Sequence, residues 1–567
     1  MWNDLYYLKQ GKKHYFGTIL IKSVDKTKDH GLKSFEVFEL IDGQQRISTI
    51  LMLLREIITQ IGSLGDPELS ADVKKLEEDY LKYGNIYKLD LMGDDKEFFR
   101  NYIINNKDYP EDLLSPSRKR LKEAKEFYQE RFELIKKSKS IEFKKFLMDF
   151  KRKIDDMDVI RYEVENDADA VLIFETVNDR GKLLTNLEKT KSFLMHAVYL
   201  AEDEGLENNL DSINTSFSDI FRWFEDIKRT ERGKNLREDD VQRYHFLIYE
   251  ELKKRRETSA KYIDYLKDKI KTLYRQDEKI SLEYALKYTE DLKRAFFALK
   301  EIVTYNEKDE IGNVLNKIFA LDRVANFYPL LISVWIRYKN NNDKNHYSKE
   351  ELLKILHLIE IASFRIYAIG KRRSNSGQGM LYTLGYEVHA SNLDFELLEA
   401  DLIKDLLEFY EDDKSFRRDL KFENFYNKIS KSDIKYLLYE YEKSLMEEPL
   451  EIPLENILVP DFQVEHVWPN SPSKLNLTPE EKLIHDQYKD KLGNLTIALR
   501  QWNESWGNKP FDKKKKKYVE SALKIQSSLA KYDIWGENEI KKRENEIIKY
   551  ALERWMIPKS YGSQMTL

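Results

Sequence analysis

The sequence predicts a predominantly helical α+β protein built from several domains. Its 567 residues are too many for one hydrophobic core, since a domain usually has about 150 residues. Strand-like segments stand near both ends of the chain, whereas apolar residues recur at helical spacing through the middle. We therefore expect domains at 1–198, 199–445 and 446–567, the second of them helical.

The composition limits the class of protein. With 41% hydrophobic and 35% charged residues, the chain is expected to form cores and to be soluble rather than disordered. The absence of cysteine excludes disulfides, thiolate zinc sites and cysteine nucleophiles, and it fits a reducing cytoplasm. The first residues lack the features of a secretory signal. The best apolar stretch, 324–336, contains Asn326 and Pro329 and is too short to span a bilayer, so we expect a core helix and no membrane contact.

The N-terminal domain is expected to start with a hairpin that leads into a helix. Residues 15–21 and 35–41 are rich in aromatic and β-branched residues, which predicts two strands, and the polar residues 25–33 predict a loop between them. The second strand runs into Asp42-Gly43-Gln44-Gln45-Arg46, after which apolar residues recur at helical spacing. The predicted arrangement is strand, tight turn, helix.

This turn suits a phosphate group. A helix N-terminus presents unpaired N–H groups and the positive end of the helix dipole. Gly43 lets the backbone approach a ligand, Gln44, Gln45 and Arg46 add donors, and Asp42 can orient a water. In a second interpretation Asp42 is an N-cap and Gln45 closes a capping box. The residues alone do not decide between the two.

The segments up to residue 445 are expected to be mainly helical. Residues 66–156 predict a helical insertion in the N-terminal domain, and 157–164 predict a strand that returns to it. The basic, glycine-rich loop 371–379 is expected to be a connector, with a DNA contact as the alternative. Two helical faces of the middle domain are formed by Tyr262, Leu266, Ile270 and Leu273, and by Leu352, Ile355, Ile359 and Phe364.

Three short motifs near the C-terminal end predict a hydrolytic centre: Glu465-His466-Val467-Trp468-Pro469, Leu492-Gly493-Asn494-Leu495-Thr496, and Asn503. Phosphodiester hydrolysis needs a base that activates water, a task for which histidine is suited near neutral pH. The carboxylate of Glu465 and the amide oxygen of Asn503 suit Mg²⁺ or Mn²⁺, which prefer oxygen ligands. The alternative is that Glu465-His466 forms a hairpin corner without a catalytic role.

A run of lysines follows Asn503. The net charge of −5 and the pI of about 6.1 do not predict nucleic-acid binding by the whole molecule, so phosphate contacts must come from local patches. Lysine runs are usually solvated surface, and that interpretation stays open beside a role in binding the DNA backbone. The candidates for DNA contact are Lys509, Lys513, Lys514 and Lys517, in a run that also holds Lys515 and Lys516.

These motifs resemble those of known families. The order of Glu465-His466, Asn494 and Asn503, with the two asparagines nine positions apart, is similar to an H-N-N variant of the HNH nucleases, which have a ββα-metal fold. Residues 41–49 resemble the DGQQR signature of the N-terminal domain of GmrSD-type, modification-dependent (type IV) restriction endonucleases, a domain related to the ParB and sulfiredoxin nucleotide-binding fold. Residues 174–184 resemble the family's F-E-T-x-N-x-R-G segment, and its tail is matched by Trp535, Ile540 and Arg543.

The resemblance implies a role for each motif. His466 would be the general base, Glu465 and Asn503 metal-site residues, and Asn494 the residue that fixes the loop and orients His466. A nucleoside triphosphate would be bound, and in an intact site hydrolysed, by Asp42, Gly43, Gln44, Gln45, Arg46, Asn178 and Arg180. For the last two residues a purely structural turn is the alternative. Family members usually begin with an I-P-x-Y-Q-R-x-Y-x-W motif that this sequence lacks, so we expect either a truncated N-terminus or an incomplete nucleotide pocket.

The leading hypothesis is a cytoplasmic prokaryotic defence nuclease that cleaves modified phage DNA under the control of its nucleotide-binding domain. Two alternatives stay open. One is a nucleotide-dependent DNA-binding switch with a degenerate nuclease centre, and the other is cleavage of RNA by the same chemistry. The sequence does not decide which nucleotide is bound, which modification is sensed, or whether the chain forms a homo-oligomer.

Overall fold

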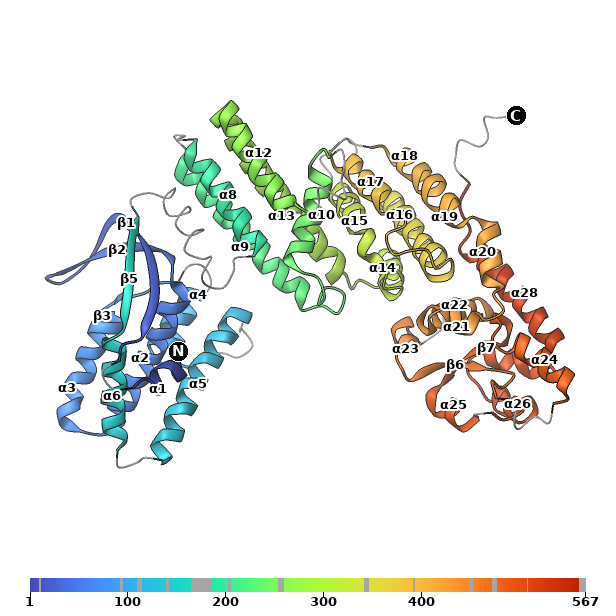
Figure 1. Ribbon diagram of the computed structural model, residues 1–567, viewed down its shortest axis with the longest axis horizontal. Helices are drawn as coiled ribbons and strands as arrows, with labels where there is room; N and C mark the ends of the chain where they lie inside the picture. Colours follow the sequence, from blue (N-terminus) through green and yellow to red (C-terminus); the bar gives the residue numbers. More distant parts are fainter. Residues whose placement is uncertain are drawn as a thin grey trace. The chain divides into compact units, whose positions relative to one another are not determined.

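The chain is mostly helical with three small sheets among its described residues, which confirms the predicted α+β class (Figure 1). By contacts it divides into an N-terminal unit, 1–211 with 273–285, and a C-terminal unit, 212–272 with 286–567. The three predicted domain ranges stay predictions. A computed structural model describes residues 1–9, 12–91, 95–109, 115–138, 142–164, 185–201, 205–252, 260–340, 346–390, 393–447, 452–471, 477–506 and 508–559.

The N-terminal unit contains a three-stranded sheet with the strand order β2-β1-β5. Strand β1 (Tyr15–His30) pairs antiparallel with β2 (Lys33–Asp42) and parallel with β5 (Asp158–Val164). This confirms the predicted hairpin and the predicted return of the chain to it after the helical segment. The parallel pairing places β5 beside β1, so that segments far apart in sequence form one sheet.

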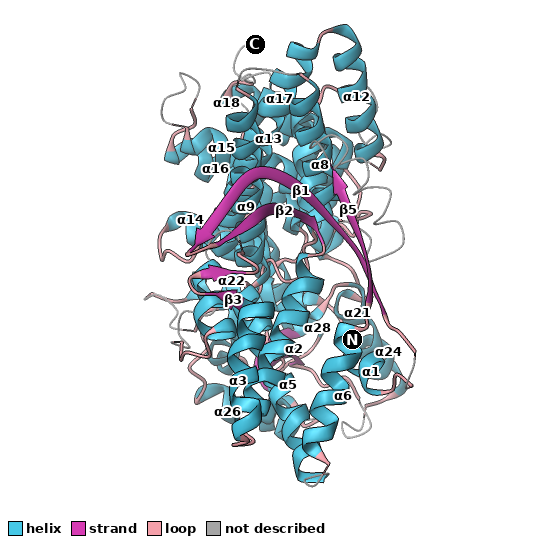
Figure 2. Ribbon diagram, turned by 90° about the vertical axis from the view of Figure 1, so that its left-hand side faces the viewer, coloured by secondary structure: helices cyan, strands magenta, loops and turns pink. Residues whose placement is uncertain are grey.

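The polar residues after position 24 do not form the predicted loop. They continue β1 to His30, which pairs with Lys33, so only a short turn remains between the strands. Their side chains are exposed, and the ladder with β2 satisfies their backbone groups, which is why a polar sequence can remain extended. A register shift between Ser23 and Lys26 accommodates Asp25, whose φ is 47°. Figure 2 shows β1 and β2 as a long curved ribbon.

Helix α2 (Gln44–Gly62) is at the centre of the N-terminal core, because its apolar residues recur at helical spacing and are buried. Trp2 packs against Phe132 and Phe150, with ring centroids 5.0 Å away in both pairs.

The other elements of this unit are α1 (Trp2–Tyr6), α3 (Pro67–Leu76), η1 (Glu77–Leu81), β3 (Lys82–Tyr83), β4 (Ile86–Tyr87), α4 (Asp95–Phe98), η2 (Phe99–Ile104), α5 (Pro116–Ser138), α6 (Phe143–Asp155) and α8 (Asn186–Leu200).

Three long helices belong partly or wholly to the C-terminal unit: α9 (Leu206–Lys228), α12 (Tyr262–Gln276) and α13 (Glu278–Thr304). The two helical faces predicted for the middle domain are buried except at Leu273. Its further helical segments are α10 (Glu238–Tyr249), α14 (Glu310–Ala320), η4 (Val324–Asn326), α15 (Tyr328–Lys339), α16 (Lys349–Ala362), η5 (Ser363–Ile369), α17 (Gln378–Ala390), α18 (Phe395–Asp401), η6 (Leu402–Glu408), α19 (Phe409–Glu411), α20 (Asp413–Leu420), α21 (Phe425–Lys428), α22 (Lys431–Leu445) and α23 (Leu454–Leu458).

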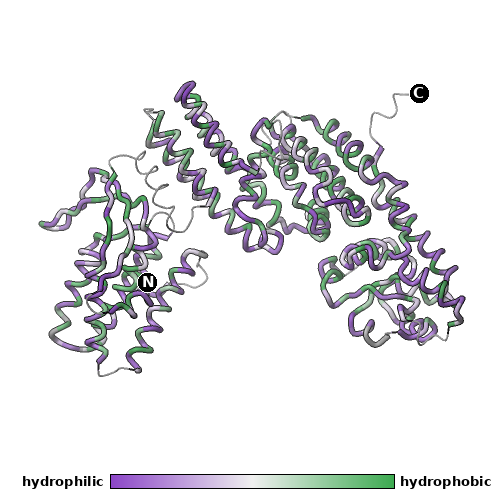
Figure 3. The backbone as a smooth tube through the Cα atoms, in the orientation of Figure 1, coloured by the Kyte–Doolittle hydropathy of each residue, from purple (hydrophilic) through white to green (hydrophobic). Residues whose placement is uncertain are grey.

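The apolar stretch 324–336 forms η4 and most of α15, and α15 is largely buried, as predicted for a core helix. Among the described residues, no helix has both the length and the apolar character needed to cross a membrane. Hydrophobic and hydrophilic residues instead alternate along the helices, as Figure 3 shows. This alternation is typical of helices that bury one face in a protein core.

Helix α28 (Glu537–Arg554) is fastened to the helical middle of its unit by buried hydrogen bonds. Arg554 donates to Glu360 of α16 at 3.2 and 3.3 Å and to Glu440 of α22 at 2.7 Å. Trp555, directly after α28, donates its Nε1–H to Glu360 at 2.8 Å. The two carboxylates are almost fully buried, so these partners are needed to offset the cost of removing the charges from water.

Glu411, at the end of α19, is a buried acid with an expected pH dependence. Burial and the neighbouring Asp419 raise the pKa of Glu411, although Arg372 lies 3.2 Å away and opposes the shift. The folded state therefore holds this proton more tightly than the unfolded chain does. Its contribution to stability is present at acidic pH and is lost as the pH rises through the raised pKa.

We predict that Glu411→Gln increases stability relative to the natural protein more at pH 8 than at pH 5. The gain in the free energy of unfolding should be larger at pH 8 than at pH 5 by about 1 kcal/mol or more, because one pKa unit corresponds to about 1.4 kcal/mol. Urea denaturation at the two pH values measures it. A stability difference that does not change with pH would show that Glu411 is ionised in the folded protein throughout this range.

Candidate functional site

The three motifs near the C-terminal end come together as a hairpin followed by a helix. Strand β6 (Phe462–His466) pairs antiparallel with β7 (Leu495–Leu499), and α25 (Arg500–Trp506) begins directly after β7. Val464 and Ile497 face each other across the pair and are buried, which favours strands at these β-branched positions. The order strand, strand, helix is the one expected for the motifs.

Asn494 uses its whole side-chain amide to join the two ends of the hairpin. It ends the short helical turn η8 (Leu492–Asn494) and is fully buried. Its Oδ1 accepts from the N–H of Trp468 at 2.7 Å and from Nε1 of Trp535 at 3.0 Å. Its Nδ2 donates to the carbonyl oxygens of Trp468 at 2.9 Å and Lys489 at 2.7 Å. The segment after His466 is therefore held against the turn before β7.

His466, the last residue of β6, lies against a carboxylate that the sequence did not indicate. Its Nε2 is 3.1 Å from Oδ1 of Asp490, and its ring centroid is 4.3 Å from that of Tyr426. The hydrogen bond from His466 holds the pKa of Asp490 below its usual value, so this carboxylate is ionised near neutral pH. If Nε2–H donates to Asp490, the lone pair is on Nδ1, where it can accept a proton.

No sequence signal singled out Asp490. It lies between Lys489 and Lys491, in a charged segment that resembles ordinary solvated surface. Only the fold brings it to His466, because the chain turns at η8 and returns along β7. Its second oxygen accepts from Nδ2 of Asn427 at 3.3 Å, so each carboxylate oxygen has a side-chain partner.

Glu465 lies in a different environment from His466, since neighbouring residues of a strand point to opposite faces. Its carboxylate accepts a hydrogen bond from Nζ of Lys514 on α26 (Phe511–Val519), and the same Nζ donates to the backbone oxygen of His466 at 2.7 Å. Both side chains are buried. Burial raises the pKa of Glu465 and lowers that of Lys514, and each partner opposes the other's shift.

The predicted metal ligands Glu465 and Asn503 both have side-chain partners within the protein. The charge of Glu465 is balanced by Lys514, and Nδ2 of Asn503, on α25, donates to the side chain of Gln463 at 2.7 Å. Across the described residues, no group of three or more histidine, aspartate or glutamate side chains is arranged to hold a metal. The Glu465 carboxylate, engaged by Lys514, therefore does not fit Mg²⁺ or Mn²⁺ as it is placed here, whereas Asn503 makes its bond through Nδ2 and not through the amide oxygen that a cation would need.

The lysine run forms α26, and its members differ in exposure. Lys509, Lys513 and Lys517 are exposed and can contact a DNA backbone. Lys514 is fully buried, which argues against the DNA contact predicted for it. The reason is geometric: five consecutive lysines on a helix cannot all face solvent when one side of that helix packs on the core. Tyr518, one turn further along, is buried on the same side.

Helix α28 supports the turn that carries Asn494. Arg543 is buried and donates through Nη1 to the carbonyl oxygens of Gly493 and Leu495, at 2.7 Å each. A Cβ at Gly493 would lie 2.1 Å from the carbonyl oxygen of Ile540. Only glycine therefore lets the turn approach the backbone of α28 so closely.

The second candidate site is the turn between β2 and α2 in the N-terminal unit. Asp42 ends β2, and Gly43, with a φ of 105°, is the N-cap of α2. No side chain caps this helix, so the interpretation of Asp42 as the N-cap is wrong. Asp42 instead accepts a hydrogen bond from Arg46 at 2.5 Å. The predicted arrangement of strand, tight turn and helix is confirmed.

The Arg46 side chain is positioned over strand β1. A Cβ at Gly17, whose φ is 113°, would lie 2.6 Å from Nη1 of Arg46, so glycine leaves the room that the guanidinium occupies. Gln44 and Gln45 are exposed at the start of α2. The turn thus combines helix N–H groups without a side-chain cap, two amides and a fixed guanidinium, all of which can bind an anion. Asn178 and Arg180 lie outside the described residues.

Two family models match the chain. One is described as the GmrSD restriction endonuclease, N-terminal domain, and matches residues 1–195. The other is described as the GmrSD restriction endonucleases, C-terminal domain, and matches residues 410–550. Together they cover more than half of the sequence and include both candidate sites. No curated protein matches the chain.

We predict that Lys514→Met lowers the free energy of unfolding by about 3–5 kcal/mol, because it leaves the buried carboxylate of Glu465 without a counter-charge. The matched control is Lys516→Met, on the exposed side of the same helix, which should change stability by no more than about 0.5 kcal/mol. Chemical denaturation compares the two. Equal effects would mean that Lys514 is not the counter-charge of Glu465.

Proposed function

The chain belongs to the GmrSD restriction endonuclease family, and from this premise we propose that it cleaves DNA at the hairpin and helix formed by β6, β7 and α25, with His466 as the general base. A restriction endonuclease acts on DNA, so DNA is its partner. The observation that carries the assignment to this site is the pair formed by His466 and Asp490. It lies beside the hydrogen bonds by which the Asn494 side chain joins the two ends of the hairpin.

In this proposal His466 takes a proton from the attacking water. Asp490 accepts the hydrogen bond from Nε2, which orients the imidazole and stabilises the positive charge that it acquires. Asn494 holds the backbone on the far side of His466, so the ring keeps its direction while the proton moves. Lys514 acts as a positioning residue, because it holds the carbonyl oxygen of His466 and the carboxylate of Glu465 together.

The exposed lysines of α26 extend the site toward the DNA backbone. Lys513 and Lys517 lie one helical turn apart on an exposed side, and Lys509 precedes the helix. Lysine side chains bind phosphate without reading the bases, so they would position the strand rather than select a sequence.

A requirement for Mg²⁺ or Mn²⁺ stays a prediction, and no step of the proposed mechanism passes through a metal. The ion pair of Glu465 with Lys514 also favours a second candidate function, a DNA-binding switch whose nuclease centre is degenerate. A nuclease that used Glu465 as a ligand would have to separate this pair. The cleavage experiment below distinguishes the two functions.

The proposal gives the turn at Asp42 to Arg46 the role of a nucleotide sensor. A nucleoside triphosphate would place a phosphate at the start of α2, where the helix N–H groups and Arg46 meet. Its binding or hydrolysis would regulate cleavage, with modified phage DNA as the target. This part rests on the resemblance of the turn to the family signature and on its anion-binding chemistry.

We predict that His466→Ala reduces DNA cleavage by at least about 100-fold, the usual contribution of a general base. The purified chain is incubated with modified phage DNA, unmodified DNA and RNA, with Mg²⁺, Mn²⁺ or EDTA, and with or without nucleoside triphosphates. His346→Ala, a change at an exposed histidine, should cleave as the natural protein does. Asp490→Asn should reduce the rate while leaving the fold intact.

Unchanged cleavage by His466→Ala would overturn the assignment of the base. DNA binding without nicking under every metal would support the switch instead.

We predict that Arg46→Ala weakens the binding of nucleoside triphosphate by about tenfold or more, since it removes a charge-assisted hydrogen bond to phosphate. Calorimetry measures the affinity for each common triphosphate. Arg152→Ala, an exposed arginine in the same unit, is the control and should bind as the natural protein does. Equal affinities of the two variants would contradict a phosphate contact at Arg46.

A further inference from the structure

One motif of the sequence belongs to neither candidate site: the basic, glycine-rich loop 371–379 in the C-terminal unit. It follows η5 and continues into the first turn of α17. It contains Lys371, Arg372 and Arg373 and no acidic residue. Whether it is only a connector or also a DNA contact depends on how the loop is held and on which of its cations are free.

Two buried side chains hold the loop in one shape. Asn326 donates through Nδ2 to the carbonyl oxygen of Ser374, and its Oδ1 accepts from Nε2 of Gln378 at 3.0 Å. Tyr367 donates its O–H to the carbonyl oxygen of Ser376 at 2.6 Å. A loop that is held in this way loses little conformational entropy when it binds a partner.

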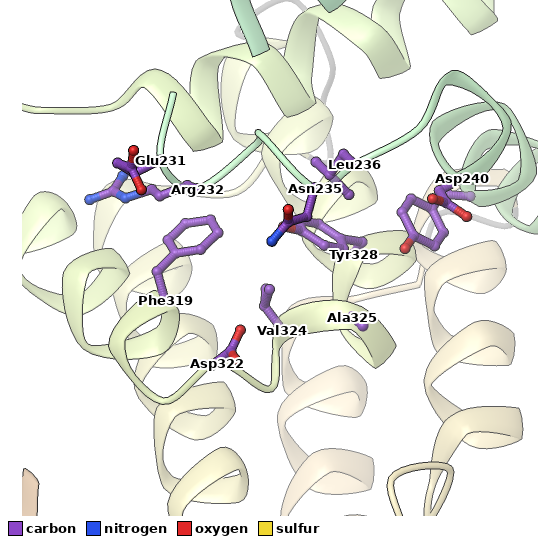
Figure 4. Close-up of a pocket in the computed structure, with 11 residues that line it drawn as sticks. Glu231, Arg232, Asn235, Leu236, Asp240, Phe319, Asp322, Val324, Ala325 and Tyr328 are labelled. Atoms are coloured by element: carbon purple, nitrogen blue, oxygen red, sulfur yellow. The ribbon is translucent and has the colours of Figure 1, made fainter. Parts of the chain in front are cut away.

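Asn326 ends η4, the short helix whose Val324 and Ala325 line a pocket of about 470 Å³ (Figure 4). Two further lining residues, Tyr244 and Tyr328, are buried and stack on each other with ring centroids 5.3 Å apart. These rings therefore pack on each other, and we assign the pocket no ligand. The role of η4 here is to support the loop.

The three cations of the loop differ in what they contact. Lys371 lies 3.6 Å from Asp433, and Arg372 lies 3.2 Å from Glu411. The side chain of Arg373 is exposed and has no ion pair or hydrogen bond with any described residue. Two ion pairs thus fasten the loop, while the third cation stays available. Its guanidinium can form two parallel hydrogen bonds with the oxygens of a phosphate.

Two exposed hydrogen-bond donors and a helix N-terminus follow Arg373. Within the described part of the chain, the side chains of Ser374 and Asn375 have no hydrogen-bond partner, so both can donate to a phosphate oxygen. Helix α17 begins at Gln378, and the positive end of its dipole adds to the attraction for an anion. Guanidinium, hydroxyl and amide groups are among those that proteins use to contact the DNA backbone.

The loop lies beside the start of α22, which leads to the candidate nuclease site. Asp433, the partner of Lys371, is the third residue of α22. Lys431, the first residue, has its Nζ 3.1 Å from the ring centroid of Tyr426. That centroid is in turn 4.3 Å from the ring centroid of His466. Since one turn of duplex DNA is about 34 Å long, a duplex at His466 can also reach the loop.

We propose that the loop 371–379 binds the backbone of the DNA substrate, with Arg373 donating to a phosphate near the one that is cleaved. The inference rests on the proposed function, because it assigns a binding surface to the DNA that this nuclease would cleave. Contacts to phosphate supply affinity that does not depend on sequence. The loop would therefore hold the strand in place without selecting bases.

The test measures the affinity of the full chain for a short labelled DNA duplex in EDTA, by fluorescence anisotropy at several salt concentrations. Arg373→Ala should weaken binding about tenfold, the usual value of one charge-assisted hydrogen bond. It should also lower the slope of log affinity against log salt concentration by about 1, because one phosphate contact is lost. Arg373→Glu should weaken binding further, since it places a like charge beside the phosphate.

The matched control is Arg294→Ala, which removes an exposed arginine of α13 in the same unit. Arg294 lies near Lys339, at the end of α15 that is opposite to η4. This variant should keep both the affinity and the salt slope of the natural protein.

Natural affinity and slope in Arg373→Ala would overturn the proposal, as would a loss of affinity at an unchanged slope. No binding of the duplex by the natural protein would also overturn it. A loss seen with single-stranded RNA and not with the duplex would assign the loop to RNA instead. Because no cleavage is needed, a failed nuclease assay together with binding that depends on Arg373 would remove the assignment of His466 and leave that of the loop. The reverse result would leave His466 and remove the loop.

Discussion

The hydrogen bonds of the Asn494 side chain are the constraint on which the geometry of the C-terminal site depends. They join the segment after β6 to the turn before β7. A backbone hydrogen bond adds to them, in which Val467 N–H donates to the backbone carbonyl oxygen of Asn494 at 2.9 Å. An aspartate could accept but not donate, and a leucine could do neither. His466 ends β6 immediately before the segment that Asn494 holds. The direction of the His466 side chain therefore depends on hydrogen bonds made by Asn494.

Two adjacent residues of β6, Glu465 and His466, make different kinds of contact. His466 faces Asp490 and Tyr426, whereas Glu465 faces the buried ammonium group of Lys514. The alternation of a strand enforces this division, because it separates two neighbours by the thickness of the sheet. The buried ion pair is costly unless both partners are present, so it specifies how α26 must lie against the hairpin. The Glu465-His466 motif thus contains the histidine that we propose as the general base and a glutamate whose ion pair fixes the packing of α26.

Local patterns predicted much of this molecule, and contacts between distant segments explain the rest. Strand and helix positions around Asn494 and Asn503 follow from residue type and spacing, because neighbours in sequence determine them. Asp490 and Lys514 acquire their roles only when helices and strands pack, and each stands among charged residues that resemble a solvated surface. The extension of β1 beyond position 24 was missed for a similar reason, since pairing with β2 outweighs polarity.

The close approach of Gly493 to α28 bears on how this candidate site could be inherited by, or transferred to, another protein. The turn contacts the helix backbone directly, and α28 is in turn fastened to Glu360 and Glu440 of the helical middle. A hairpin and helix moved alone into another scaffold would lack the surface that shapes the turn. The hairpin and helix are therefore not an independent unit. An exchange between relatives by recombination would have to include α28, Glu360 and Glu440 together with the motif.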